Sequence, residues 1–64
     1  MGLKIKFKRM EKGFTQQELA DKVRISRYYL SAIERDKAKN PSITVMKKIA
    51  ELLETPVQEL FFEG

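Results

Sequence analysis

Residues 15–35 read TQQELADKVRISRYYLSAIER, the pattern of two short helices joined by a tight turn. Thr15 and Glu18 have the spacing of a capping box, in which the threonine hydroxyl accepts a backbone N–H of the first turn and the glutamate reaches back to the cap. The apolar residues behind this cap fall on one helical face: Leu19, Ala20 and Val23. The spacing therefore predicts an amphipathic helix over 16–23.

The second helix of this stretch is predicted over 26–35. Ser26 has the residue type of an N-cap, and Leu30 and Ile33 lie three residues apart on the face that points to the core. The two residues between the helices leave room only for a tight turn. The helices must therefore cross steeply, and the second must project from the surface.

The outward face of helix 26–35 carries the candidate functional residues. Advancing about 100° per residue from the cap places four side chains away from the core: Arg27, Tyr28, Ser31 and Arg35. A guanidinium can bind guanine O6 and N7, a hydroxyl can bond to either kind of base edge, and an aromatic ring can cover a thymine methyl. Taken alone, the same residues also fit a polar solvent face with one exposed tyrosine.

The flanking segments predict three further helices. In the N-terminal segment Leu3, Ile5 and Phe7 alternate with lysines like a strand, but Leu3, Phe7, Met10 and Phe14 also have helical spacing. A helix is expected because no other segment could pair with a lone strand. Ser42 is expected to cap a helix whose apolar residues are Val45, Met46, Ile49, Ala50 and Leu53.

A short final helix is expected after Thr55, which would act as its cap with Pro56 at the first helical position. Its apolar stripe is Val57, Leu60 and Phe61. The whole chain is thus predicted to be all-α, a compact single domain of five helices over 1–64 with short connections.

Composition excludes several classes of protein. The 64 residues include no cysteine and no histidine, which rules out a disulfide framework, a zinc finger and any Cys- or His-based nucleophile. No Gly-rich phosphate loop or metal-ligand cluster is seen in the sequence, so no cofactor, no metal and no catalytic activity are expected. No apolar run approaches the ~20 residues that span a bilayer, and lysines interrupt the position of a signal peptide. A soluble, cytoplasmic protein without a membrane partner is expected.

Charge is unevenly distributed along the chain. Residues 1–40 hold 11 Lys and Arg against 5 Asp and Glu, whereas residues 41–64 hold 2 against 4. A basic first part with an acidic end suggests that one part of the surface faces a polyanion.

Four short motifs carry a resemblance to a known family: TQQELA at 15–20, ISR at 25–27, LSAIER at 30–35 and NPS at 40–42. At these separations they resemble the Xre family of helix-turn-helix regulators, the lambda-repressor-like DNA-binding domains of bacteria and phages. The resemblance runs from about residue 5 to residue 62. It implies a homodimeric transcriptional regulator, expected to be a repressor, that binds double-stranded DNA with helix 26–35 in the major groove of an inverted-repeat operator. No small-molecule effector is evident.

The resemblance also implies roles for individual residues. Arg27, Tyr28 and Ser31 stand at base-reading positions, whereas Ala32 occupies another such position with no polar group to offer. Gln16 is expected to touch phosphate and to brace the first residue of helix 26–35. The remaining expected phosphate contacts are Ser26, Arg35, Lys37, Lys39 and Asn40.

Two further sets of residues follow from the family pattern. Arg9 and Glu34 match a structural ion pair that joins the first and third helices. The family binds as a two-fold dimer, and a dimer is expected here because one recognition helix contacts too few base pairs for specificity. The candidate dimer surface is the segment after Thr55, with Val57, Phe61 and Phe62. Two adjacent aromatic residues cannot both face one core, so one of the phenylalanines is expected to be exposed.

One position departs from the family pattern. The turn residue that is usually a glycine in a left-handed conformation is Arg24 here. A residue other than glycine costs about 1 kcal/mol in that conformation, so either the turn accepts this strain or it has another shape.

A protein-interaction module of the same fold, similar to an antitoxin or an antirepressor, stays open as the alternative function. Its binding surface would be the exposed apolar residues, among them one of the two C-terminal phenylalanines. RNA is less favoured, because the aromatic residues are not interleaved with lysines on a sheet. Salt-dependent binding to random duplex DNA would distinguish DNA binding from a protein-interaction role.

Overall fold

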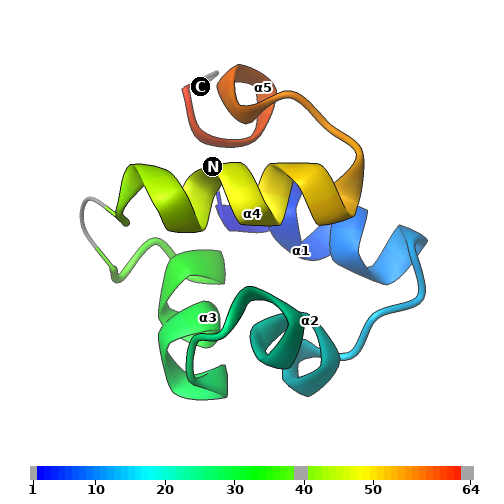
Figure 1. The fold of residues 1–64 in the computed structure, drawn as a ribbon, viewed down its shortest axis with the longest axis vertical. Coiled ribbons are helices and arrows are strands. Elements are labelled where there is room, and N and C mark those ends of the chain that lie inside the picture. Colours follow the sequence, from blue (N-terminus) through cyan, green and yellow to red (C-terminus); the bar gives the residue numbers. More distant parts are fainter. Residues whose placement is uncertain (1, 39–40, 63–64) are drawn as a thin grey trace.

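Five helices make up the part of the chain that this computed structural model describes, residues 2–38 and 41–62 (Figure 1). They are α1 (Gly2–Glu11), α2 (Gln16–Val23), α3 (Arg27–Glu34), α4 (Ile43–Leu53) and α5 (Val57–Phe61). In Figure 1, α1 and α4 lie between α5 at one end and the α2–α3 pair at the other. The predicted all-α class is confirmed.

The core takes a fully buried side chain from every helix. The largest side chains with almost no exposed surface are Ile5, Leu19, Leu30, Ile33, Ile49, Leu53 and Leu60. All except Ile5 lie at positions where helical spacing predicted an inward face. The 3–4 periodicity therefore located the core correctly in four of the five helices.

In α1 the inward face differs from the one that the apolar spacing suggested. Ile5 is fully buried and Arg9, one turn later, is 7 % exposed, whereas Leu3, Phe7 and Met10 are 60 %, 60 % and 57 % exposed. The predicted helix is confirmed, but Leu3, Phe7 and Met10 of its expected apolar stripe point to solvent. Phe14 lies beyond the end of the helix and is partly buried against the core. The reason is that Arg9 is held by α3, and a residue four positions earlier lies on the same side of the helix.

The predicted caps of α2, α3 and α4 are confirmed. The Thr15 hydroxyl accepts the Glu18 N–H at 3.0 Å, and the Thr15 N–H donates to the Glu18 carboxylate at 2.8 Å, which completes the capping box. The hydroxyls of Ser26 and Ser42 each accept the N–H three residues further on, at 2.9 and 3.2 Å. The starts of α2, α3 and α4 are thus determined by local sequence.

The predicted cap of α5 is wrong. Thr55 is buried, and its hydroxyl donates backwards to the Leu53 carbonyl at 2.9 Å. The helix begins at Val57, with Pro56 as the residue before it and no side-chain cap. Thr55 is needed at the end of α4, where the last carbonyl groups have no partner within the helix.

The turn between α2 and α3 adopts the left-handed conformation without glycine. Arg24 has φ 68° and ψ 44°, and its N–H donates to the Asp21 carbonyl at 3.2 Å. The next N–H, of Ile25, donates to the Ala20 carbonyl at 3.0 Å. This is the hydrogen-bond pattern of a Schellman end, so the turn accepts the backbone strain and keeps its shape.

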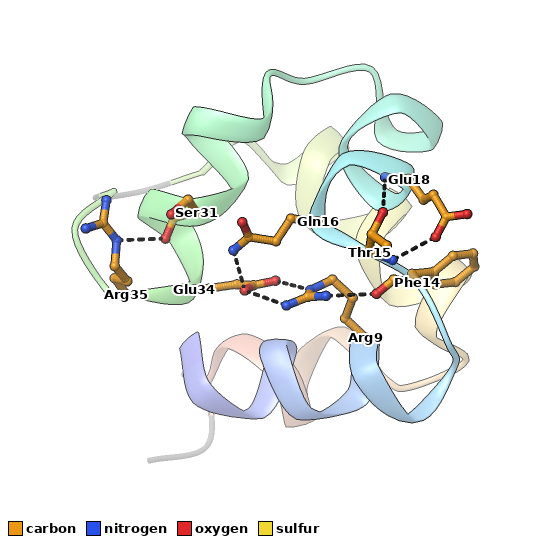
Figure 2. Close-up of polar contacts among 8 residues, drawn as sticks. All are labelled: Arg9, Phe14, Thr15, Gln16, Glu18, Ser31, Glu34 and Arg35. Atoms are coloured by element: carbon orange, nitrogen blue, oxygen red, sulfur yellow. Dashed lines mark hydrogen bonds and ion pairs between the residues drawn. The ribbon is translucent and has the colours of Figure 1, made fainter.

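A buried ion pair joins α1 to α3 (Figure 2). Arg9 Nε lies 2.7 Å from Glu34 Oε2, and the two side chains are 9 % and 2 % exposed. The same guanidinium donates to the Phe14 carbonyl at 2.8 Å, and the side-chain amide of Gln16 donates to Glu34 Oε1 at 3.0 Å. The carboxylate of α3 is therefore bound by residues of both α1 and α2.

The first residues of α1 pack closely against the end of α3. The Gly2 N–H donates to the Asp36 carboxylate at 3.1 Å. Gly2 is buried, and a Cβ at this position would overlap the backbone carbonyl of Glu34. Only glycine permits this approach of the two backbones.

A second ion pair lies on the surface. Lys12 Nζ is 2.9 Å from the Glu54 carboxylate, which links the end of α1 to the end of α4. The hydrogen bond and the charge of Lys12 lower the pKa of Glu54. A lowered carboxyl pKa favours the folded state above the ordinary glutamate pKa, and this contribution is lost as the pH falls through the lowered value.

We expect Arg24→Gly to raise the free energy of unfolding by up to about 1 kcal/mol, because glycine adopts the left-handed conformation without strain. The matched control is Lys22→Gly on the exposed side of α2, where glycine should cost about 1 kcal/mol. Urea denaturation of both variants measures the difference. Equal losses in the two variants would show that residue 24 is not strained.

The buried ion pair should behave as a coupled unit. Arg9→Ala and Glu34→Ala are each expected to destabilise the fold by roughly 2–4 kcal/mol, since each leaves a buried partner without its counter-charge. The double variant should lose clearly less than the sum. Alanine variants of the Lys8–Glu11 pair, 3.7 Å apart with side chains 33 % and 69 % exposed, serve as controls and should change stability by less than about 0.5 kcal/mol. Additive losses for Arg9 and Glu34 would contradict the coupling.

Candidate nucleic-acid interface

α3 has an apolar inner face and a polar outer face. Leu30 and Ile33 are completely buried, whereas Arg27 and Tyr28 are exposed, Tyr28 by 74 %. Ser31 is half-buried one turn later. The structure thus brings the three predicted base-reading residues together on one side of the helix.

The start of this face is held by the cap and the turn before it. Ser26 ends the turn and binds the Tyr29 N–H, while Tyr29 itself is half-buried against the core. Figure 1 shows α2 and α3 crossing steeply, as expected for so short a connection. The first turn of α3 carries the guanidinium of Arg27 and the phenol of Tyr28, and both residues are exposed.

The chemistry of this face suits DNA bases. Arg27 offers several N–H donors in a planar fork that matches guanine O6 and N7, and Tyr28 offers a hydroxyl and an aromatic surface. Ser31 can donate or accept. These groups distinguish base edges only in the major groove, which is wide enough for an α-helix.

The expected phosphate contacts surround this face. Gln16 opens α2, and Ser26, Arg35 and Lys37 are exposed at or beyond the ends of α3. Lys39 and Asn40, which the family pattern also placed here, lie outside the described residues. Arg35 lies along its own helix, because its Nε donates to the Ser31 carbonyl at 3.4 Å (Figure 2).

The partner of Gln16 differs from the one that the family pattern implied. Its side-chain amide binds Glu34 near the end of α3, not the first residue of that helix. The cause is the buried carboxylate, which offers a stronger acceptor than a neutral group would. Gln16 therefore helps to position α3 at its C-terminal end.

The charge of Glu34 is compensated locally. This carboxylate lies close to the outer face of α3, but it is bound by Arg9 and buried. A compensated carboxylate does not oppose an approaching polyanion, whereas the exposed arginines and lysines of α3 and the following loop attract it.

The expected dimer surface requires a correction. Phe61 is 7 % exposed and belongs to the core, so its side chain is not available to a second subunit. Phe62 is 65 % exposed, as expected for one of the two rings, and Val57 is half-buried. α5 packs against α1 and α4, and Phe61 is buried in this contact together with Leu60.

Other kinds of site receive no support from the described residues. Within residues 2–38 and 41–62, no group of three His, Cys, Asp or Glu side chains could hold a metal ion. In the same residues, no helix has the length and apolar character needed to cross a bilayer.

Comparison with known proteins identifies relatives of this arrangement. A family model described as helix-turn-helix matches residues 5–60. The transcriptional regulator SinR of Bacillus subtilis is 41 % identical over 63 residues, which cover 98 % of this chain and 57 % of SinR. The immunity repressor of Bacillus phage phi105 is 40 % identical over 63 residues, covering 98 % of this chain and 43 % of the repressor.

A solved structure of SinR in complex with DNA has the same fold. It superposes with a TM-score of 0.83 at 42 % identity and covers 92 % of this chain and 94 % of that one. The chain spans about 57 % of the length of the curated relative SinR. From the matched residues, the fold and these relatives, the chain belongs to the Xre-type family of helix-turn-helix proteins.

Proposed function

We propose that this chain is the DNA-binding domain of a transcriptional regulator, a single domain over residues 1–64 with its helix-turn-helix unit at about 16–35. α3 would enter the major groove, where Arg27, Tyr28 and Ser31 read base edges. The observation that carries the proposal is the polar outer face of α3, held outward by the buried Leu30 and Ile33. The structure of SinR, a relative that shares this fold, is of a complex with DNA.

The contacts around α3 would position the domain without reading sequence. Ser26 and Lys37 are exposed at its two ends, and Arg35 and Gln16 lie on its flank. Groups of this kind bind phosphate oxygens, which fix the register of a protein on the duplex. The proposed activity is binding and not catalysis, in the cytoplasm of a bacterium or of a cell that carries a phage.

Repression through a homodimer is the most specific form of the proposal. A single recognition helix contacts only a few base pairs, so two copies on an inverted repeat are needed for specificity in a genome. Half-site centres would lie about 10 base pairs apart, one turn of the duplex. The phi105 relative carries the name of an immunity repressor, which favours repression over activation.

Selection of duplexes from a random pool, followed by mobility shifts, tests this function directly. Arg27→Ala is expected to cost about 1–3 kcal/mol per half-site on the selected operator and little on random DNA. Lys37→Ala is the matched control. It should weaken both complexes by similar factors and lower the salt slope by about one unit per half-site.

The ratio of operator to random affinity separates the two roles. It should fall for Arg27→Ala and stay nearly constant for Lys37→Ala. The opposite pattern would mean that α3 is not the reading element. A parent chain that binds no duplex DNA even at low salt would favour the protein-interaction module of the same fold.

Self-association should depend on the exposed ring after α5. Phe62→Ser is expected to shift the chain toward monomer in sedimentation experiments and to leave its helical content unchanged, because this ring is outside the core. Phe7→Ser removes an equally exposed ring from α1 and serves as the control. Dissociation by Phe7→Ser alone would place the dimer contact on α1 instead.

A further inference from the structure

An open pocket of about 400 Å³ lies between α1, the start of α2 and the end of α3. Lys6 of α1 lines the pocket together with Gln16 of α2, Ser31 of α3 and Arg35, the residue that follows α3. Three of these four residues already belong to the proposed DNA-binding surface. Lys6 is the member that neither the family pattern nor the helical spacing indicated.

The acidic groups of this pocket are bound by other parts of the protein. Glu34 forms its wall, but Arg9 and Gln16 hold that carboxylate. Asp36 stands at its edge and accepts the Gly2 N–H.

The cations of the pocket are free to meet an anion. Within the described part of the chain, no carboxylate lies within ion-pair distance of Lys6 or Arg35. The Nε of Arg35 is directed to the Ser31 carbonyl, which leaves its terminal nitrogens for another acceptor. Because Arg9 compensates the charge of Glu34, the remaining charges of the pocket are the cations Lys6 and Arg35 and the carboxylate of Asp36.

We propose that this pocket seats a backbone phosphate of the bound duplex and that Lys6 supplies a contact from α1. The proposal rests on DNA binding by α3, since the pocket adjoins the outer face of that helix. Lys6 and Arg35 would both donate charged hydrogen bonds to the phosphate, beside the side chain of Gln16. α1 would thereby become a third element of the DNA interface, beside α2 and α3.

The lysines of α1 provide a matched control for this contact. Lys4 and Lys6 are both exposed and carry the same charge, but residues two apart on a helix point to nearly opposite sides. Lys6 lines the pocket and Lys4 does not. Lys4→Gln and Lys6→Gln therefore remove the same net charge, but only Lys6→Gln removes a cation from the pocket.

The experiment measures duplex affinity as a function of salt for the parent, Lys4→Gln, Lys6→Gln and Lys6→Arg. Lys6→Gln is expected to lower the slope of log K against log salt by about one unit per half-site. It should weaken operator and random DNA by the same factor, because a phosphate carries no sequence information. Lys4→Gln and Lys6→Arg should keep the parental slope, and thermal unfolding should be the same for all four proteins.

The possible contrary results are distinct. Equal slopes for Lys4→Gln and Lys6→Gln would overturn the phosphate seat and leave DNA binding by α3 intact. A loss confined to the operator would also overturn it, because Lys6 would then read bases. Failure of the parent to bind any duplex would overturn the proposed function itself and this inference with it.

Discussion

The buried carboxylate of Glu34 is the group on which the arrangement of α1, α2 and α3 depends. A carboxylate that is 2 % exposed is destabilising unless each of its oxygens has a partner. Arg9 and Gln16 supply these partners from two other helices, and the same arginine also holds the Phe14 carbonyl. Because the bonds that Arg9 and Gln16 make to Glu34 end on α3, residues outside the proposed reading helix help to determine its position.

The residues that hold α3 in place are different from the residues that would read bases. α3 is held by apolar contacts of Leu30 and Ile33 and by the polar cluster at its end, whereas Arg27 and Tyr28 project into solvent. Exposed substitutions usually change stability by less than about 0.5 kcal/mol. Members of such a family can therefore change the bases that they read while keeping the same scaffold, which is consistent with the fold shared at about 40 % identity with SinR.

Local patterns were sufficient to predict the helices, the caps at Thr15, Ser26 and Ser42, and the core positions of α2 to α5. These patterns did not predict the buried face of α1. Periodicity shows which residues share a face of a helix, but the buried face of α1 is the one that carries Arg9, whose charge is bound by α3. The patterns also failed at Thr55, where the preceding helix claims the hydroxyl. The pairing of Arg9 with Glu34 and the phosphate contacts came from family resemblance, whereas helical spacing alone placed Arg27, Tyr28 and Ser31 on the outward face. The pocket beside Lys6 could not be predicted, because residues from three separate parts of the chain form it.

The close approach of Gly2 to the end of α3 limits how the motif can be transplanted. A segment cut at residue 15 and moved into another scaffold would keep both helices of the motif and their turn. It would lose the arginine that neutralises Glu34 and the amide that binds the Asp36 carboxylate. The transferable unit therefore begins at α1, and Gly2, the first residue of that helix, must stay a glycine, although the motif by which the family is recognised starts more than a dozen residues later.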